Sequence, residues 1–156
     1  MRTRHHVRRR EFLKITGRAL GLFAATAQVQ STVVHAAEDD LRPVRRDPAL
    51  LRRLLNEMDA KGSQFWSVPR QDGEFLHFLV KATRARNILE VGTSQGFSAI
   101  WMGLALEETG GRLTTIEIDP ARHTLARRHV SEAQLSQRIT LIRGDAHAEV
   151  AKLDGP

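Results

Sequence analysis

Two carboxylates and two glycines stand at the ends of predicted strands, where they could hold a ligand. Glu90 and Gly92 close one apolar run, and Gly96 follows after a short polar loop. Glu117 ends the next apolar run, 21 residues after Gly96. A glycine at a strand end lets the backbone turn tightly and approach a ligand. An acidic residue about 20 residues after such a loop is placed to accept hydrogen bonds from a ribose diol. The spacing indicates a pocket for a nucleoside-bearing ligand.

The loop itself does not fit a dinucleotide. The dinucleotide fingerprint would place glycines at 92, 94 and 97, whereas Ser94 and Phe97 occupy the last two positions. S-adenosylmethionine has no pyrophosphate and presents an amino acid, a sulfonium, a ribose and an adenine, which suit carboxylates and small polar groups. An NAD-dependent oxidoreductase is the less favoured alternative, and Glu117 as a solvated rim residue is another.

Glu90 is unusual because it lies inside an apolar strand. An ionised carboxylate there is costly unless it has partners. A ligand ammonium group or nearby backbone N–H groups would satisfy it.

Strands that alternate with helices position these residues. The pattern predicts strands at 88–91, 113–118 and 139–142, and helices at 48–61, 97–109, from 120 onward and from 146 to 153. A further helix is expected to begin at Asp72, with Phe75, Leu76, Leu79 and Val80 buried. Such alternation predicts βαβ units and a parallel sheet with helices on its faces.

Charge and composition exclude several classes of protein. The formal charge of +6 resides wholly in residues 1–36, because the remaining 120 residues hold 17 basic and 17 acidic side chains. Because the rest of the chain carries no net charge, its charge does not indicate nucleic-acid binding. The absence of cysteine excludes disulfides, thiolate catalysis and Cys-ligated zinc. No apolar run reaches the ~20 residues that a membrane span requires.

The N-terminal segment, residues 1–36, resembles a twin-arginine export signal. Its motif is Arg9-Arg10-Glu11-Phe12-Leu13-Lys14, and an apolar stretch with small-residue exits follows it. Cleavage after Ala36 is favoured over cleavage after Ala27. We therefore expect the twin-arginine machinery as a partner and a periplasmic or otherwise exported location. A retained amphipathic helix and a cytoplasmic location are the alternatives.

Residues 67–156 resemble the cation-dependent O-methyltransferases, the family of catechol and caffeoyl-CoA O-methyltransferases. The resemblance rests on the ordered motifs DGEFL (72–76), ILEVGTSQGFS (88–98), TIEIDP (115–120) and ITLIRGDA (139–146). It implies an α/β, Rossmann-like class I S-adenosylmethionine methyltransferase fold, of which the chain holds the N-terminal half only. Residues 37–86 would form an N-terminal helical segment, and residues 87–156 the first βαβαβ part of the cofactor domain.

The family implies cofactor contacts at eight positions. They are Val68, Gly92, Thr93 and Ser98 around the methionine portion, Glu90 near its amino group, Glu117 at the ribose, and Asp145 and Ala146 at the adenine.

Members of the family continue into a fourth strand, which lies beside the first and ends in a metal-binding aspartate. Further metal ligands and substrate loops come after it. The resemblance therefore implies a Mg-like divalent metal only in a full-length relative; it assigns no metal ligand to this chain and leaves the catalytic residues unknown. Without that strand, residues 88–91 would present an unpaired edge.

The expected activity is methyl transfer to a hydroxyl of a small molecule, by a fragment or truncated product. A non-catalytic exported remnant or binding protein is the alternative, and a homodimer is left open. We expect surface or packing roles for His77, His123, His129 and His147. Trp66 is expected either to cover a ligand or to pack in the core.

Overall fold

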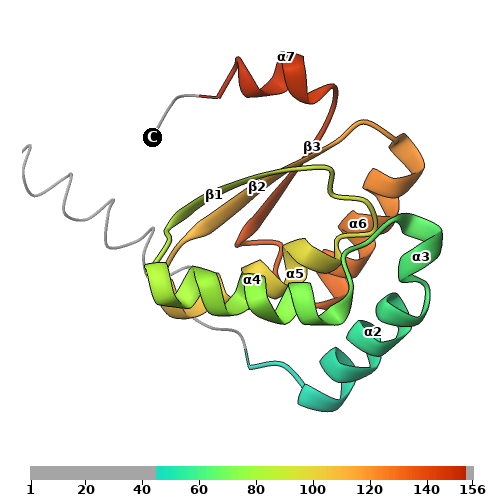
Figure 1. Cartoon of the computed structure of the whole chain (residues 1–156), viewed down its shortest axis with the longest axis vertical. Helices are drawn as coiled ribbons and strands as arrows, with labels where there is room; N and C mark the ends of the chain where they lie inside the picture. Colours follow the sequence, from blue (N-terminus) through green and yellow to red (C-terminus); the bar gives the residue numbers. More distant parts are fainter. Residues whose placement is uncertain (1–44, 154–156) are drawn as a thin grey trace, which may run out of the picture. The chain divides into compact units, whose positions relative to one another are not determined.

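Three parallel strands form the sheet of the described part of the chain (Figure 1). The computed structural model describes residues 45–153, so the predicted export signal lies outside the described residues. The strands are β1 (Asn87–Val91), β2 (Arg112–Glu117) and β3 (Ile139–Arg143), in the order β1-β2-β3. Both neighbouring pairs are parallel. The predicted α/β class with a parallel sheet is confirmed.

Six helices are described around this sheet. They are α2 (Pro48–Ala60), α3 (Gly62–Phe65), α4 (Arg70–Thr83), α5 (Phe97–Thr109), α6 (Pro120–Glu132) and α7 (Ala146–Val150). Asp47 and Asp119 cap α2 and α6 through their side chains, and each precedes a proline in the first turn. Within residues 45–153, none of the helices has the length and apolar character that a membrane crossing would require.

The helix α4 differs from its prediction in two respects. It begins at Arg70 after Pro69, so Asp72 lies in its first turn and is not its cap. Phe75 and Leu79, expected to be buried, are exposed. The reason is that α4 packs on α5 through the face that carries Gly73, and an added Cβ there would lie 2.3 Å from Trp101. The opposite face of α4 has no covering element among the described residues.

The two faces of the sheet are covered unequally. The helices α4, α5 and α6 lie on one side, where Leu113 and Ile139 join the buried core, and α7 lies on the other (Figure 1). Leu89 and Val91 alternate onto the side away from the core and are 45% and 61% exposed. The strand β1 also forms an edge of the described sheet, as expected.

A partly buried ion pair links the segment before α2 to the helical layer. The guanidinium of Arg46 donates two hydrogen bonds to the Glu107 carboxylate, at 2.7 and 2.6 Å, and a third to the Ala133 carbonyl oxygen. Such bidentate pairs fix geometry as well as adding energy. Residues 45–60 are thereby held against α5 and the end of α6.

Candidate functional site

The loop between β1 and α5 has a backbone that glycine makes possible. Gly92 and Gly96 have φ values of +91° and +90°, and Ser94 between them has a φ of +51°. Gly96 lies against α6, because a Cβ on it would lie 3.4 Å from the Ala126 Cβ. A Cβ on Gly92, by contrast, would have no atom within 4 Å. The space beside Gly92 is therefore open to a ligand.

Glu117 lies against this loop rather than pointing into solvent. Its carboxylate accepts the backbone amide of Ser94 at 2.7 Å and that of Asp119 at 2.9 Å. The residue is only 6% exposed, which excludes the alternative of a solvated rim residue. Each carboxylate oxygen keeps acceptor capacity beyond these two bonds. Glu117 thus joins the glycine loop to the end of β2.

Glu90 is held by side-chain hydroxyls. Ser98 and Thr115 donate to its two carboxylate oxygens at 2.5 and 2.6 Å. The Thr93 and Thr115 hydroxyl oxygens lie 2.6 Å apart. Because Thr115 gives its one hydrogen to an ionised Glu90, Thr93 must be the donor in that pair. The partners expected for Glu90, a ligand cation or backbone amides, are replaced here by this chain of hydroxyls.

Burial raises the pKa of the Glu90 carboxyl above its ordinary value of 4.5. The hydroxyls of Ser98 and Thr115 offset part of this rise, while the charge of Glu117 adds to it. A cation bound near Glu90 would favour its ionised form.

The segment before α4 lies beside the glycine loop. The Ser94 hydroxyl donates to the Phe65 carbonyl oxygen, and Val68 packs partly buried against the core. Trp66 is 85% exposed, so the expectation that it might pack in the core is wrong. Its ring lies under the Arg122 guanidinium, 5.7 Å from carbon to centroid.

The end of β3 joins the same edge of the sheet. The Gly144 amide donates to the Glu117 carbonyl oxygen, which sets Asp145 and Ala146 beside the end of β2. The Asp145 side chain accepts from the His147 amide and caps α7. The eight predicted contact residues come from four segments whose ends meet at this edge, and their contacts with a cofactor stay predictions.

Three polar residues of this edge escaped the sequence analysis. Thr115 shares a face with Glu90 through the strand register, a signal that required the β1–β2 pairing. Gln95 and Ser67 hydrogen-bond to each other across 28 residues of chain, a contact with no local signal.

Three of the histidines within residues 45–153 have packing or surface positions. His129 is buried on α6, and His77 lies edge-on to Trp101, while His147 is exposed. No group of three or more metal-ligating side chains is present in the part of the chain that the structure describes.

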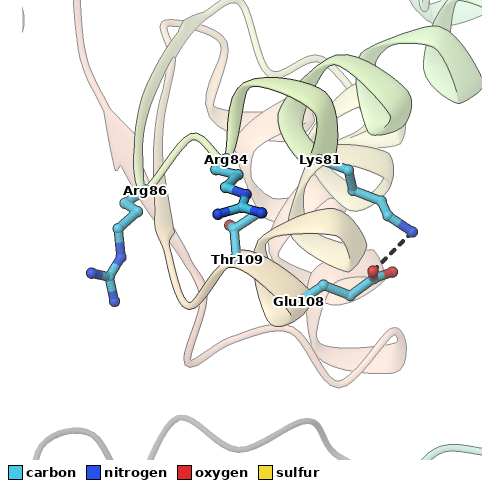
Figure 2. A pocket seen from close by; sticks show the side chains of 5 residues that line it. All are labelled: Lys81, Arg84, Arg86, Glu108 and Thr109. Carbon is cyan, nitrogen blue, oxygen red and sulfur yellow. Dashed lines mark ion pairs between the residues drawn. The ribbon is translucent and has the colours of Figure 1, made fainter.

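A hollow of about 500 Å³ lies at the other end of the sheet. Its lining residues are Lys81, Arg84, Arg86, Glu108 and Thr109 (Figure 2). They come from the ends of α4 and α5 and from the start of β1, where cations complement helix-terminal carbonyls. Ligands of open α/β sheets bind beyond the carboxyl ends of the strands, so this hollow is not the candidate site.

Comparison with known proteins shows the family to which this chain is similar. A profile of the O-methyltransferase family matches residues 43–155. The catechol O-methyltransferase of Niastella koreensis is 36% identical over 119 residues, which are 76% of this chain and 52% of that protein.

Solved structures of O-methyltransferases are similar to the described fold. The O-methyltransferase from Bacillus cereus in complex with SAH superposes with a TM-score of 0.59 at 32% identity, over 70% of this chain and 49% of that one. The O-methyltransferase TomG from Streptomyces achromogenes, in complex with SAM, gives 0.59 at 31% identity, over 72% and 50%. The chain spans about half the length of the curated relatives it matches.

Proposed function

Because the chain belongs to the O-methyltransferase family, we propose that it binds S-adenosylmethionine at the edge formed by β1, β2 and β3. Its described fold is the matching part of a class I methyltransferase, with a three-stranded parallel sheet and flanking helices. The reaction proposed for the whole protein is methyl transfer to a hydroxyl of a small molecule. When bound, the cofactor supplies an electrophilic methyl group on its sulfonium.

One observation carries this proposal: an open position at Gly92 follows the strand end that carries Glu90 and belongs to the loop that Glu117 holds. Nothing stands within 4 Å of a Cβ built there. Glu90 precedes Gly92 by two residues, and the Glu117 carboxylate bonds to the amide of Ser94, two residues after it. Two anionic groups around an open backbone suit a ligand with an ammonium and a diol better than one with a pyrophosphate. This charge distribution supports S-adenosylmethionine over NAD.

Each of the candidate residues would contact a different part of the cofactor. Glu90, with Ser98 on it, would face the amino group, and Gly92 and Val68 would flank the methionine chain. Glu117 would accept the ribose hydroxyls with its free lone pairs. The hydroxyl of Thr93 is buried and donates to Thr115, so any contribution from that residue would come from its backbone. Asp145 and Ala146 would border the adenine.

These residues would bind and orient the methyl donor, and orientation supplies a large part of the barrier reduction in such a displacement. Activation of the acceptor hydroxyl would fall to the region of the related enzymes that this chain does not match. A divalent metal there, as the family resemblance implies, would lower the hydroxyl pKa.

Calorimetric titration of the full chain tests the proposal. We expect heat of binding with S-adenosylhomocysteine and none with NAD⁺. Glu117→Ala should weaken that binding by about 1–3 kcal/mol, because charge-assisted hydrogen bonds are lost. Glu57→Ala, at an exposed position of α2, is the matched control. No heat from a folded sample with either ligand would overturn the proposal in favour of a non-catalytic protein.

We also propose that residues 1–36 direct export through the twin-arginine route. The support is the Arg9-Arg10 motif with its downstream Phe12-Leu13-Lys14, which lies outside the described residues. Fusion of residues 1–40 to a reporter that works only outside the cytoplasm tests it. Replacement of both arginines by lysine should abolish the signal, and full activity of that variant would contradict export by this route.

A further inference from the structure

Gln95 is the most deeply buried polar side chain of the glycine loop, at 1% exposure. A buried amide normally has a structural or functional reason, because each unpaired donor there is costly. Both hydrogens of its Nε2 are used: one goes to the Met58 carbonyl oxygen and the other to the Ser67 hydroxyl, each at 2.9 Å. Gln95 therefore bonds to the last turn of α2 and to the segment before α4.

The backbone of Gln95 is fixed from a third direction. Its carbonyl oxygen lies 2.9 Å from Nδ1 of His129, which is buried on α6. A carbonyl oxygen can only accept, so Nδ1 carries the hydrogen and donates it. Gly96 rests directly on Ala126, one turn earlier on α6. The loop is thus clamped between α6 on one side and residues 58–67 on the other.

Ser67, which accepts one of the Gln95 hydrogen bonds, is itself next to the candidate site. Ser67 lies between Trp66, which is exposed with a φ of +55°, and Val68, predicted to contact the cofactor. A non-glycine residue in this backbone region persists only where its surroundings hold it. The bonds from Gln95 to Ser67 and from Ser94 to Phe65 are the contacts that hold this turn to the glycine loop.

We infer that Gln95 is a positioning residue, which fixes residues 66–68 over the cofactor edge without touching the cofactor. Loss of its amide would leave Val68 and Trp66 free to move away from Gly92, and the ligand would then have to order them on binding. That ordering lowers affinity. The cofactor part of this inference rests on the proposed function, whereas the ordering of Trp66 does not.

The test uses the full chain labelled with 5-fluorotryptophan. The chain has two tryptophans, so Trp66 and Trp101 give two fluorine signals, which Trp66→Phe assigns. Gln95→Met removes the amide at similar volume, and Ser67→Ala removes one of its two bonds. Thr109→Val is the matched control, because it deletes a partly buried hydrogen bond, to the Ala85 carbonyl oxygen, at the opposite end of the sheet.

We expect Gln95→Met to shift or sharpen the Trp66 signal and to leave the Trp101 signal in place. Its dissociation constant for S-adenosylhomocysteine should rise about tenfold, within the range for residues that affect a ligand only through other residues. Ser67→Ala should give a smaller change of the same kind. Thr109→Val should lower thermal stability and change neither signal nor affinity.

An unchanged Trp66 signal in folded Gln95→Met and Ser67→Ala would overturn the inference. An equal loss of affinity in Thr109→Val would do the same, because it would show a general effect of stability. If the unsubstituted chain fails to bind S-adenosylhomocysteine, the proposed function is overturned, and the Trp66 signal alone decides whether Gln95 positions this segment.

Discussion

The ends of β1 and β2 each carry a carboxylate that accepts two hydrogen bonds, but the two are held by different kinds of donor. Glu90 accepts from the hydroxyls of Ser98 and Thr115, whereas Glu117 accepts from the backbone amides of Ser94 and Asp119. A hydroxyl can rotate and exchange its donor and acceptor roles, and a backbone amide can only donate. The β1 end can therefore adapt to a change of charge, and the β2 end cannot.

This difference matches what each position would do. An adaptable carboxylate could take up or release a proton as a cationic group arrives beside it. A carboxylate fixed by two amides instead keeps one geometry and holds the glycine loop to β2. Substitutions that remove charge or a hydrogen-bonding group without changing shape should therefore affect stability differently at the two strand ends.

The largest effect is expected from Glu117→Gln. Its new NH₂ group would face one of the two backbone amides, so that a donor meets a donor and one bond is lost. We expect the free energy of unfolding to fall by about 2–3 kcal/mol in urea denaturation. Glu57→Gln on the exposed face of α2 should change it by less than about 0.5 kcal/mol. Equal behaviour of the two variants would show that the amides do not depend on Glu117.

Thr115→Val should have an intermediate effect. Valine has nearly the same shape, but it removes the donor to Glu90 and the acceptor for Thr93 together. The expected loss is about 1–2 kcal/mol in the free energy of unfolding, measured in the same way. Thr140→Val, at an exposed position of β3, is the control. A tolerated Thr115→Val would indicate that water replaces the hydroxyl and that the network is not closed.

Glu90→Gln should have the smallest effect at neutral pH. Ser98 and Thr115 can turn to pair with an amide, and the cost of burying a charge disappears. We expect the free energy of unfolding at about pH 7 to fall by less than about 0.5 kcal/mol, or to rise.

The stability difference between Glu90→Gln and the unsubstituted chain should depend on pH, because the pKa of Glu90 is raised in the folded state. As the pH rises above 4.5, the unfolded chain releases this proton before the folded chain does, so the unsubstituted protein loses stability. Glutamine does not titrate. The stability of Glu90→Gln relative to the unsubstituted chain should therefore increase from about pH 4.5 to about pH 7. A constant difference would contradict the raised pKa.

The candidate site could be predicted from the sequence where its signals are local. The glycines at 92 and 96 and the acid at 117 have a spacing that reports a strand, a turn and a helix, and the structure places them at one edge. The predicted helix starts at 48 and 120 are likewise confirmed, with Asp47 and Asp119 as their caps.

The failures have a common cause. The burial of Phe75 and Leu79 was expected from an apolar pattern, yet a pattern cannot tell which face of α4 has a neighbour. The α4 face with Gly73 accepts Trp101, so the other apolar face remains exposed. The start of α4 was misplaced because Pro69 and Asp72 both carry helix-start signals, and only the packed structure selects one.

The succession of strands and helices along the chain, the glycine loop and the two carboxylates at strand ends could all be predicted from the sequence. These features depend on backbone conformation and on near neighbours in the chain. The donors that hold each carboxylate, and the bonds from Gln95 to α2, α6 and the segment before α4, were visible only in the folded chain. Five of those seven bonds span 23 to 37 residues of chain, and such distant groups meet only when helices and strands pack against each other.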